Sequence, residues 1–119
     1  MPRTTLLPLL LLAASAGPAL GQTAPAEPAN ILAGRTLAQE LCSACHLTGP
    51  EDRGPVPDGV PTFMAIGAEP GQTEAALTAR LFHEHPLMPQ PPLTQEQAAD
   101  VVAYILSLRP EGEGEAVPP

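Results

Sequence analysis

The sequence contains neither lysine nor tryptophan, and it is short of basic and aromatic side chains in general. One tyrosine and two phenylalanines are its aromatic residues, and five arginines stand against thirteen Asp and Glu residues, which gives a formal net charge of −8. Nucleic acids and anionic membrane surfaces attract basic proteins, so neither is expected as a partner. A small chain with so few large side chains also makes a thin apolar core from its own residues.

Cysteine is scarce too, and the two that occur stand close together in Cys42-Ser43-Ala44-Cys45-His46. The pattern C-x-x-C-H is the attachment signature of c-type haem. Two thiols add across the two vinyl groups of one porphyrin, and the short spacing lets both sulfurs reach the same edge of the ring. The histidine that follows lies under the iron and ligates it. We therefore predict one covalent haem c, attached through Cys42 and Cys45 with His46 on the iron, which would also enlarge the thin core.

Three other uses of the same residues remain open from the pattern alone. A C-x-x-C pair can be a thioredoxin-like redox centre, although that motif follows a strand and this one ends a helical pattern. It can be half of a zinc site that His46 completes with His83 or His85. In an exported protein it can also be a structural disulfide. Haem attachment is favoured over all three.

The N-terminal segment has the pattern of an export signal. Arg3 gives a positive start, residues 6–14 form an apolar run, and Ala19 and Gly21 are the small residues that a signal peptidase reads. We predict a cleaved signal peptide over residues 1–21. Because c-type haem is attached outside the cytoplasmic membrane in bacteria, we also predict a periplasmic location. The alternative is a retained anchor, but the apolar run is well short of the ~20 residues that span a bilayer.

The rest of the chain divides into a leader, one domain and a tail. Residues 22–29 and 110–119 are rich in small and polar residues and proline and are predicted to be disordered, so that residues 30–109 hold the domain. Apolar residues at helical spacing predict an all-α domain with three main helices. The helices are expected at 31–41 after an Asn30 cap, 74–82 after a Thr73 cap, and 95–108 after a capping box of Thr94 and Gln97.

The first and last of these helices each carry an apolar face for packing. Gly34 interrupts the first face at a cost in helix stability, which predicts that another helix approaches it closely. Between the helices, residues 47–61 are expected to form a loop and residues 62–67 a short apolar segment. The faces consist of Ile31, Gly34, Leu37, Ala38 and Leu41 in the first helix, and of Ala98, Val101, Ile105 and Leu108 in the last.

Met88 is the candidate for the second iron ligand. It lies in a stiff, proline-rich loop over residues 86–92, between two predicted helices. A thioether is a soft, neutral donor that suits haem iron, and the flanking prolines limit the freedom that it loses on binding. The alternatives are that Met88 only fills the core, that Met64 is the ligand, or that His83 or His85 gives an iron with two histidines.

From Gly34 to Leu108 the chain resembles a small class I bacterial cytochrome c. The resemblance implies the cytochrome c fold, in which helices and loops wrap around one haem and the first and last helices cross, here at Gly34. The order of the matching pieces is specific to that family. They are Gly34 with the C-x-x-C-H motif, Gly54-Pro55, Pro61-Thr62-Phe63, Met88-Pro89, and Asp100-Val101-Val102-Ala103-Tyr104-Ile105.

The resemblance also implies roles for residues around the haem. The carbonyl of Pro55 is expected to accept the Nδ1–H of His46, and Phe63 is expected beside the haem. Where the family often has an aromatic residue four positions before the first cysteine, this chain has Ala38. No tryptophan is present to bond a haem propionate, and Arg53 is the candidate for that contact.

A haem iron with two permanent protein ligands has no open position for a substrate, so it can only gain or lose an electron. The sequence therefore predicts a soluble, monomeric, periplasmic electron carrier without a stable membrane span, rather than an enzyme. Its partners would be periplasmic redox proteins with basic docking surfaces. The alternative is a dedicated cytochrome subunit of a periplasmic dehydrogenase, and a haem peroxidase or gas sensor would need the position of Met88 to open.

Overall fold

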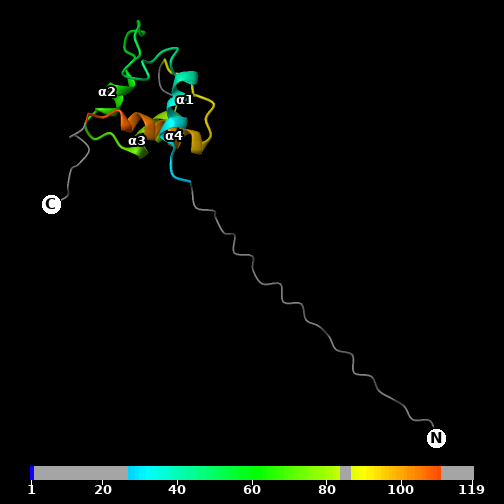
Figure 1. Ribbon diagram of the computed structural model, residues 1–119. Coiled ribbons are helices and arrows are strands. Elements are labelled where there is room, and N and C mark those ends of the chain that lie inside the picture. Colours follow the sequence, from blue (N-terminus) through cyan, green and yellow to red (C-terminus); the bar gives the residue numbers. More distant parts are fainter. Residues whose placement is uncertain (2–26, 84–86, 111–119) are drawn as a thin grey trace, which may run out of the picture.

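The structure is a computed structural model that describes residue 1, residues 27–83 and residues 87–110. The predicted signal peptide beyond its first residue, most of the predicted leader, His85 and all but the first residue of the predicted tail lie outside this part. Within it, the secondary structure consists of four α-helices and the loops between them (Figure 1). None of these helices has the length and apolar character that crossing a bilayer requires.

The three main helices form where the sequence predicts them. They are α1 at Ile31–Leu41, α3 at Glu74–Phe82 and α4 at Gln95–Ser107. The apolar segment after the long loop adds a short helix, α2, at Phe63–Gly67. Each helix begins after a side chain that accepts hydrogen bonds from its first N–H groups, which is why the starts agree with the sequence. These caps are Asn30, Thr62, Thr73 and Thr94, the last with Gln97 in a capping box.

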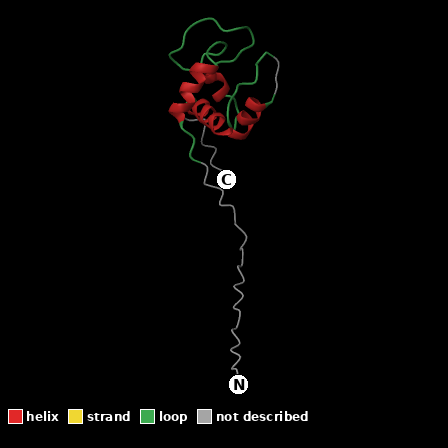
Figure 2. Ribbon diagram, turned by 90° about the vertical axis from the view of Figure 1, so that its right-hand side faces the viewer, coloured by secondary structure: helices red, strands yellow, loops and turns green. Residues whose placement is uncertain are grey.

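The helices group together while the long loop between α1 and α2 arches away from them (Figure 1, Figure 2). α1 packs mainly against α4, and α4 also contacts α2 and α3. At the crossing of α1 and α4, a Cβ on Gly34 would lie 1.9 Å from the carbonyl oxygen of Asp100. The predicted close approach at Gly34 is therefore confirmed, and only a residue without a side chain fits there.

The buried face of α1 is narrower than the sequence suggested. Gly34, Ala38 and Cys42 are buried, whereas Ile31 and Leu41 are 47% and 41% exposed. The sequence placed Ile31 and Leu41 on the apolar face of this helix, but α1 packs mainly against one helix, and a single partner covers one stripe. The core is completed mainly by α4, whose buried residues are Ala98, Val101, Val102, Tyr104 and Ile105, while Leu108 is half-buried.

A second glycine contact, at Gly67, brings α2 onto the other half of α4. A Cβ on Gly67 would lie 2.5 Å from the carbonyl oxygen of Ile105. Arg109, just beyond α4, donates from Nε to the carbonyl of Gly67 over 2.8 Å and from Nη2 to the carbonyl of Gln72. Gly67 was not predicted to matter for packing, because the sequence does not show which backbone approaches it.

Candidate haem site

The two cysteines lie on a hydrogen-bonded turn that directly continues α1. The N–H of Cys42 donates to the carbonyl of Ala38 over 2.9 Å, and the N–H groups of Cys45 and His46 both donate to the carbonyl of Cys42, over 3.1 and 2.9 Å. Cys42 is buried and Cys45 is exposed, and both are free thiols. A turn this tight keeps two sulfurs within reach of one porphyrin edge. Burial raises the pKa of the Cys42 thiol, so this position suits a neutral thioether.

His46 is oriented by a backbone carbonyl on the far side of the long loop. Its Nδ1 lies 2.7 Å from the carbonyl oxygen of Pro61, the distance of a normal hydrogen bond. Because a carbonyl can only accept, Nδ1 carries the proton, and the lone pair of Nε2 is available to a metal ion. The ring is thus held in the tautomer that an iron ligand needs.

The carbonyl that His46 contacts corrects the expectation from the family resemblance, which named Pro55. The reason is the docking of α2: the N–H of Phe63 donates to the carbonyl of Leu47 over 2.9 Å. That bond brings the residues just before α2 alongside the haem motif and presents Pro61 to the imidazole. Pro55 instead lies exposed in the long loop, directly after Gly54, whose backbone φ is 137°.

Phe63 forms an aromatic wall beside the histidine, and its expected place near the haem stays a prediction. Its ring centroid lies 5.4 Å from that of His46 and 6.5 Å from that of Tyr104, both at tilted angles. Only 4% of Phe63 is exposed. Tilted rings at these distances attract one another, so Phe63 gives the histidine an apolar neighbour from the core.

The loop that follows His46 is held by a carboxylate that the sequence analysis missed. One oxygen of Asp52, Oδ2, accepts hydrogen bonds from the N–H of Thr48, the hydroxyl of Thr48 and the N–H of Gly49, each over 2.8 Å. These bonds, that of the Thr48 hydroxyl first, hold the pKa of Asp52 below its usual range, and Arg35 adds to the effect. In the sequence, turn residues separate Thr48, which can donate hydrogen bonds, from Asp52, which can accept them. This pattern is the signal from which the role of Asp52 could have been predicted.

The same loop is tied to α4 by a tyrosine. The hydroxyl of Tyr104 donates to the backbone carbonyl of Thr48 over 2.8 Å. Thr48 is fully buried, and Tyr104 is only 5% exposed. Burial raises the pKa of the Tyr104 phenol, which therefore keeps the proton that it donates. This long-range bond fixes the loop after His46 against the last helix.

Met88 lies half-buried against the apolar core, and the residue before it has an unusual backbone. Leu87 has a φ of 71°, in the left-handed region that favours glycine, and its side chain is 87% exposed. The chain after Met88 is held to α3, because Nε2 of Gln90 donates to the carbonyl of Phe82 over 2.6 Å. The backbone thus turns Met88 toward the core and Leu87 toward solvent.

Of the other candidate ligands, two lie within the described residues. Met64 is half-buried within α2, and His83 is exposed at the C-terminal cap of α3. His85 lies outside the described residues. In the part of the chain that the structure describes, no group of three or more metal-binding side chains gathers as a zinc site would require.

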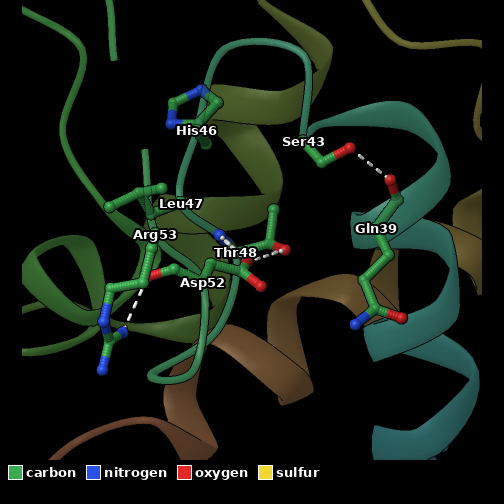
Figure 3. Close-up of a pocket in the computed structure, with 7 residues that line it drawn as sticks. All are labelled: Gln39, Ser43, His46, Leu47, Thr48, Asp52 and Arg53. Carbon is green, nitrogen blue, oxygen red and sulfur yellow. Dashed lines mark hydrogen bonds between the residues drawn. The ribbon is translucent and has the colours of Figure 1, made fainter. Parts of the chain in front are cut away.

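A polar hollow of about 390 Å³ lies on one side of His46 (Figure 3). Arg53 borders it and donates from one guanidinium nitrogen to the carbonyls of Pro50 and Asp52, over 2.7 and 2.8 Å. Neither cysteine, Phe63 nor Met88 lines this hollow, so it is separate from the apolar side of the histidine. Its lining consists of Gln39 and Ser43 from α1 and its end, and of His46, Leu47, Thr48, Asp52 and Arg53.

The described residues fit a c-type haem. They offer two free thiols on one turn, an imidazole whose Nε2 lone pair is available, an apolar wall and a half-buried thioether. Comparison with known proteins agrees, since residues 31–109 match the sequence model of the Cytochrome c family. The chain belongs to the cytochrome c family. Cytochrome c-552 of Bradyrhizobium diazoefficiens is 35% identical over 77 residues, which cover 65% of this chain and 73% of that protein. No solved structure matches at a significant level.

Membership of the family decides several of the open questions. This cytochrome has the all-α cytochrome c fold and one covalently bound haem c, and it transfers electrons rather than catalysing a reaction. The predictions of fold class, cofactor and electron carriage are thereby confirmed. The thioredoxin-like, zinc and disulfide interpretations of Cys42 and Cys45 no longer have support.

Proposed function

We propose that this cytochrome is a periplasmic electron carrier whose haem is attached through Cys42 and Cys45 and whose iron is held by His46 and Met88. The observation that carries the proposal is the bond between Nδ1 of His46 and the carbonyl of Pro61. This bond leaves the lone pair of Nε2 available to the iron and raises the basicity of the imidazole, as expected of a permanent iron ligand. A histidine kept only for packing would have no need of this orientation.

The backbone at Leu87 supports Met88 as the second ligand. A left-handed conformation costs a residue with a branched side chain on the order of 1–2 kcal/mol. Here it exposes an apolar leucine, which adds a second unfavourable feature, while the neighbouring thioether turns inward. Such a local cost is understandable if Met88 makes a strong bond that offsets it. Met64 lies within the ordinary helical backbone of α2 and has no comparable feature.

With His46 and Met88 on the iron, the role of the chain would be to hold these two ligands in both oxidation states. The haem supplies a one-electron couple between ferric and ferrous iron. Phe63, which is buried, gives the histidine an apolar neighbour on one side, which would limit changes in solvation there when the charge changes. The prolines that follow Met88, Pro89, Pro91 and Pro92, limit the freedom of that loop, which would keep rearrangement small on the gain or loss of an electron.

Export and partner choice are part of the proposal. The N-terminal pattern of residues 1–21 is that of a cleaved signal peptide, and haem c attachment occurs outside the cytoplasm in bacteria. With no lysine and a formal charge of −8, the protein would associate as a monomer with redox partners that present a basic surface. The rate of electron transfer to such a partner should fall as ionic strength rises, because salt screens this attraction.

Replacement of the two methionines tests the ligand assignment. Met88→His should keep the haem, abolish the weak red absorption band of a ferric iron–thioether bond, and lower the reduction potential, since imidazole is the stronger donor to ferric iron. The matched control, Met64→Leu, should keep the band and nearly the same potential. If Met64→Leu loses the band and Met88→His keeps it, the wrong methionine has been named.

A further inference from the structure

The carboxylate of Asp52 closes a turn by hydrogen bonds to a single oxygen atom. Its Oδ2 accepts from both the N–H and the hydroxyl of Thr48 and from the N–H of Gly49, and the N–H of Asp52 donates back to the carbonyl of Gly49 over 3.1 Å. Hydrogen bonds to an ionised acceptor are among the stronger ones in proteins. The turn from Thr48 to Asp52 is therefore a rigid unit, and it begins two residues after His46.

This turn is linked to three helices. The carbonyl of Thr48 accepts from the hydroxyl of Tyr104 in α4. The carboxylate of Glu51 pairs with Arg35 in α1. One residue before the turn, the carbonyl of Leu47 accepts from the N–H of Phe63 at the start of α2. The position of the Thr48 backbone thus decides how α2 lies against the haem motif.

Two hydrogen bonds then join the motif to the start of α2. One runs from Phe63 N–H to the carbonyl of Leu47 over 2.9 Å, and the other joins Nδ1 of His46 to the carbonyl of Pro61 over 2.7 Å. We name this pair of bonds the histidine clasp. Both members on the motif side, His46 and Leu47, directly precede the turn that Asp52 closes. A turn that loosens would let the clasp open, because the backbone that carries the Leu47 carbonyl continues directly into the turn.

We propose that Asp52 is a positioning residue for the iron ligand His46, acting through the turn and the histidine clasp. The inference rests on the proposed function in one respect, the role of His46 on the iron. A firm hydrogen bond from Nδ1–H to the carbonyl of Pro61 makes the imidazole a better electron-pair donor to the iron, which favours the ferric state. A weaker bond should therefore raise the reduction potential. No hydrogen bond joins Asp52 to His46, so Asp52 would act on this ligand only through the position of the backbone.

Two replacements of Asp52 separate its geometry from its charge. Asp52→Asn removes the charge but keeps a side-chain oxygen that can accept the same three bonds. Asp52→Ala removes both charge and acceptor. The charge effect is common to the two variants, so any difference between them reports positioning. Asp58→Asn is the matched control, because Asp58 is an exposed carboxylate of the same loop without a hydrogen bond or ion pair among the described residues.

The readout is the exchange rate of the His46 Nδ1–H with solvent in the ferrous haem protein, followed by NMR, together with the reduction potential. We expect Asp52→Ala to speed this exchange by about tenfold or more, relative to the buried amides of Val101 and Val102. The Asp52→Asn and Asp58→Asn variants should stay within about twofold of the unaltered protein. The potential of Asp52→Ala should exceed that of Asp52→Asn.

Equal exchange rates and equal potentials for Asp52→Ala and Asp52→Asn would overturn the proposal. If Asp52→Ala does not retain haem, Thr48→Val provides the same test, since it deletes one of the three donors and keeps the shape. That variant should speed Nδ1–H exchange a few-fold, and an unchanged rate would overturn the proposal. Failure of the proposed role of His46 is separate: it would appear in the NMR spectrum of the unaltered ferrous protein as His46 ring protons without the large shifts that binding to haem iron causes, whatever the exchange rates are.

Discussion

The carbonyl oxygen of Asp100 occupies the space that a side chain on Gly34 would need, with 1.9 Å between it and the position of the missing Cβ. The carboxylate of the same residue accepts the N–H of Asn30 over 2.6 Å, just before α1 begins. Asp100 therefore holds both the start of α1 and its closest approach to α4. This crossing directs the end of α1, and with it the cysteine motif, to the core.

Gly34→Ala should destabilise the protein despite the better helix propensity of alanine, which alone would stabilise by ~1 kcal/mol. The new methyl group meets backbone atoms that cannot rotate away, so the two helices must separate. We expect a net loss of about 2–3 kcal/mol in the free energy of unfolding, measured by denaturant titration of the haem protein. The control Glu40→Ala lies on the exposed side of α1 and should change stability by less than ~0.5 kcal/mol. If the two variants were equally stable, the close contact between α1 and α4 at Gly34 would be contradicted.

Tyr104→Phe should leave the carbonyl of Thr48 buried without its donor. The ring and its contact with Phe63 are kept, so the change isolates one hydrogen bond. We expect a loss of about 1–3 kcal/mol in unfolding free energy, the cost of an unsatisfied buried acceptor. Ser107→Ala removes a hydroxyl bond within α4 instead and should cost less than ~0.5 kcal/mol, since Ser107 is exposed. A tyrosine variant as stable as the serine variant would show that water replaces the bond.

Replacing both Cys42 and Cys45 with alanine should prevent covalent retention of haem, because no other thiol exists in the chain. Each single replacement should keep haem attached through the remaining thioether. Denaturing electrophoresis with a haem stain distinguishes these outcomes. A double variant that still stains would refute attachment at this motif.

The stability contributed by Asp52 should depend on pH in a defined direction. Hydrogen bonds from Thr48 and Gly49, together with Arg35 in α1, lower its pKa in the folded state, while Glu51 and the neutral phenol of Tyr104 are the other groups nearby. The pKa of an Asp in the unfolded chain is about 3.9. Because the pKa of Asp52 is lower in the folded protein, its ionised carboxylate contributes fully to stability when the pH is above the unfolded pKa. This contribution to stability is lost as the pH falls through the pKa of the folded state.

The difference in unfolding free energy between the native protein and Asp52→Asn should therefore be constant above about pH 5 and shrink as the pH is lowered below about 4. Denaturant titrations at a series of pH values measure it. Asp58→Asn removes an exposed carboxylate of the same loop. Its unfolding free energy should change with pH in parallel with that of the native protein over the same range. A difference between native and Asp52→Asn that grows on acidification would contradict the role of the ionised carboxylate.

The sequence by itself determined the three main helices and the haem motif, because the signals for both are local. Asn30, Thr73 and Thr94 each cap the helix that follows, and such bonds span only two or three residues. The C-x-x-C-H spacing likewise lies within one turn of chain. The close approach of another helix at Gly34 was also predictable from the sequence. A glycine within an apolar helical face weakens the helix, so it is favoured there mainly where a second backbone comes close.

Only the tertiary structure decided which distant groups meet at the histidine. Pro55 and Pro61 lie in the same proline-rich loop, and nothing in their spacing tells which carbonyl faces His46; the docking of α2 chose Pro61. The bond between Tyr104 and Thr48 joins residues 56 positions apart. Contacts of this kind depend on how the helices pack, because packing brings together groups whose separation along the chain carries no pattern. Local hydrogen bonding and periodicity thus determined the elements, and packing determined the surroundings of the iron ligand.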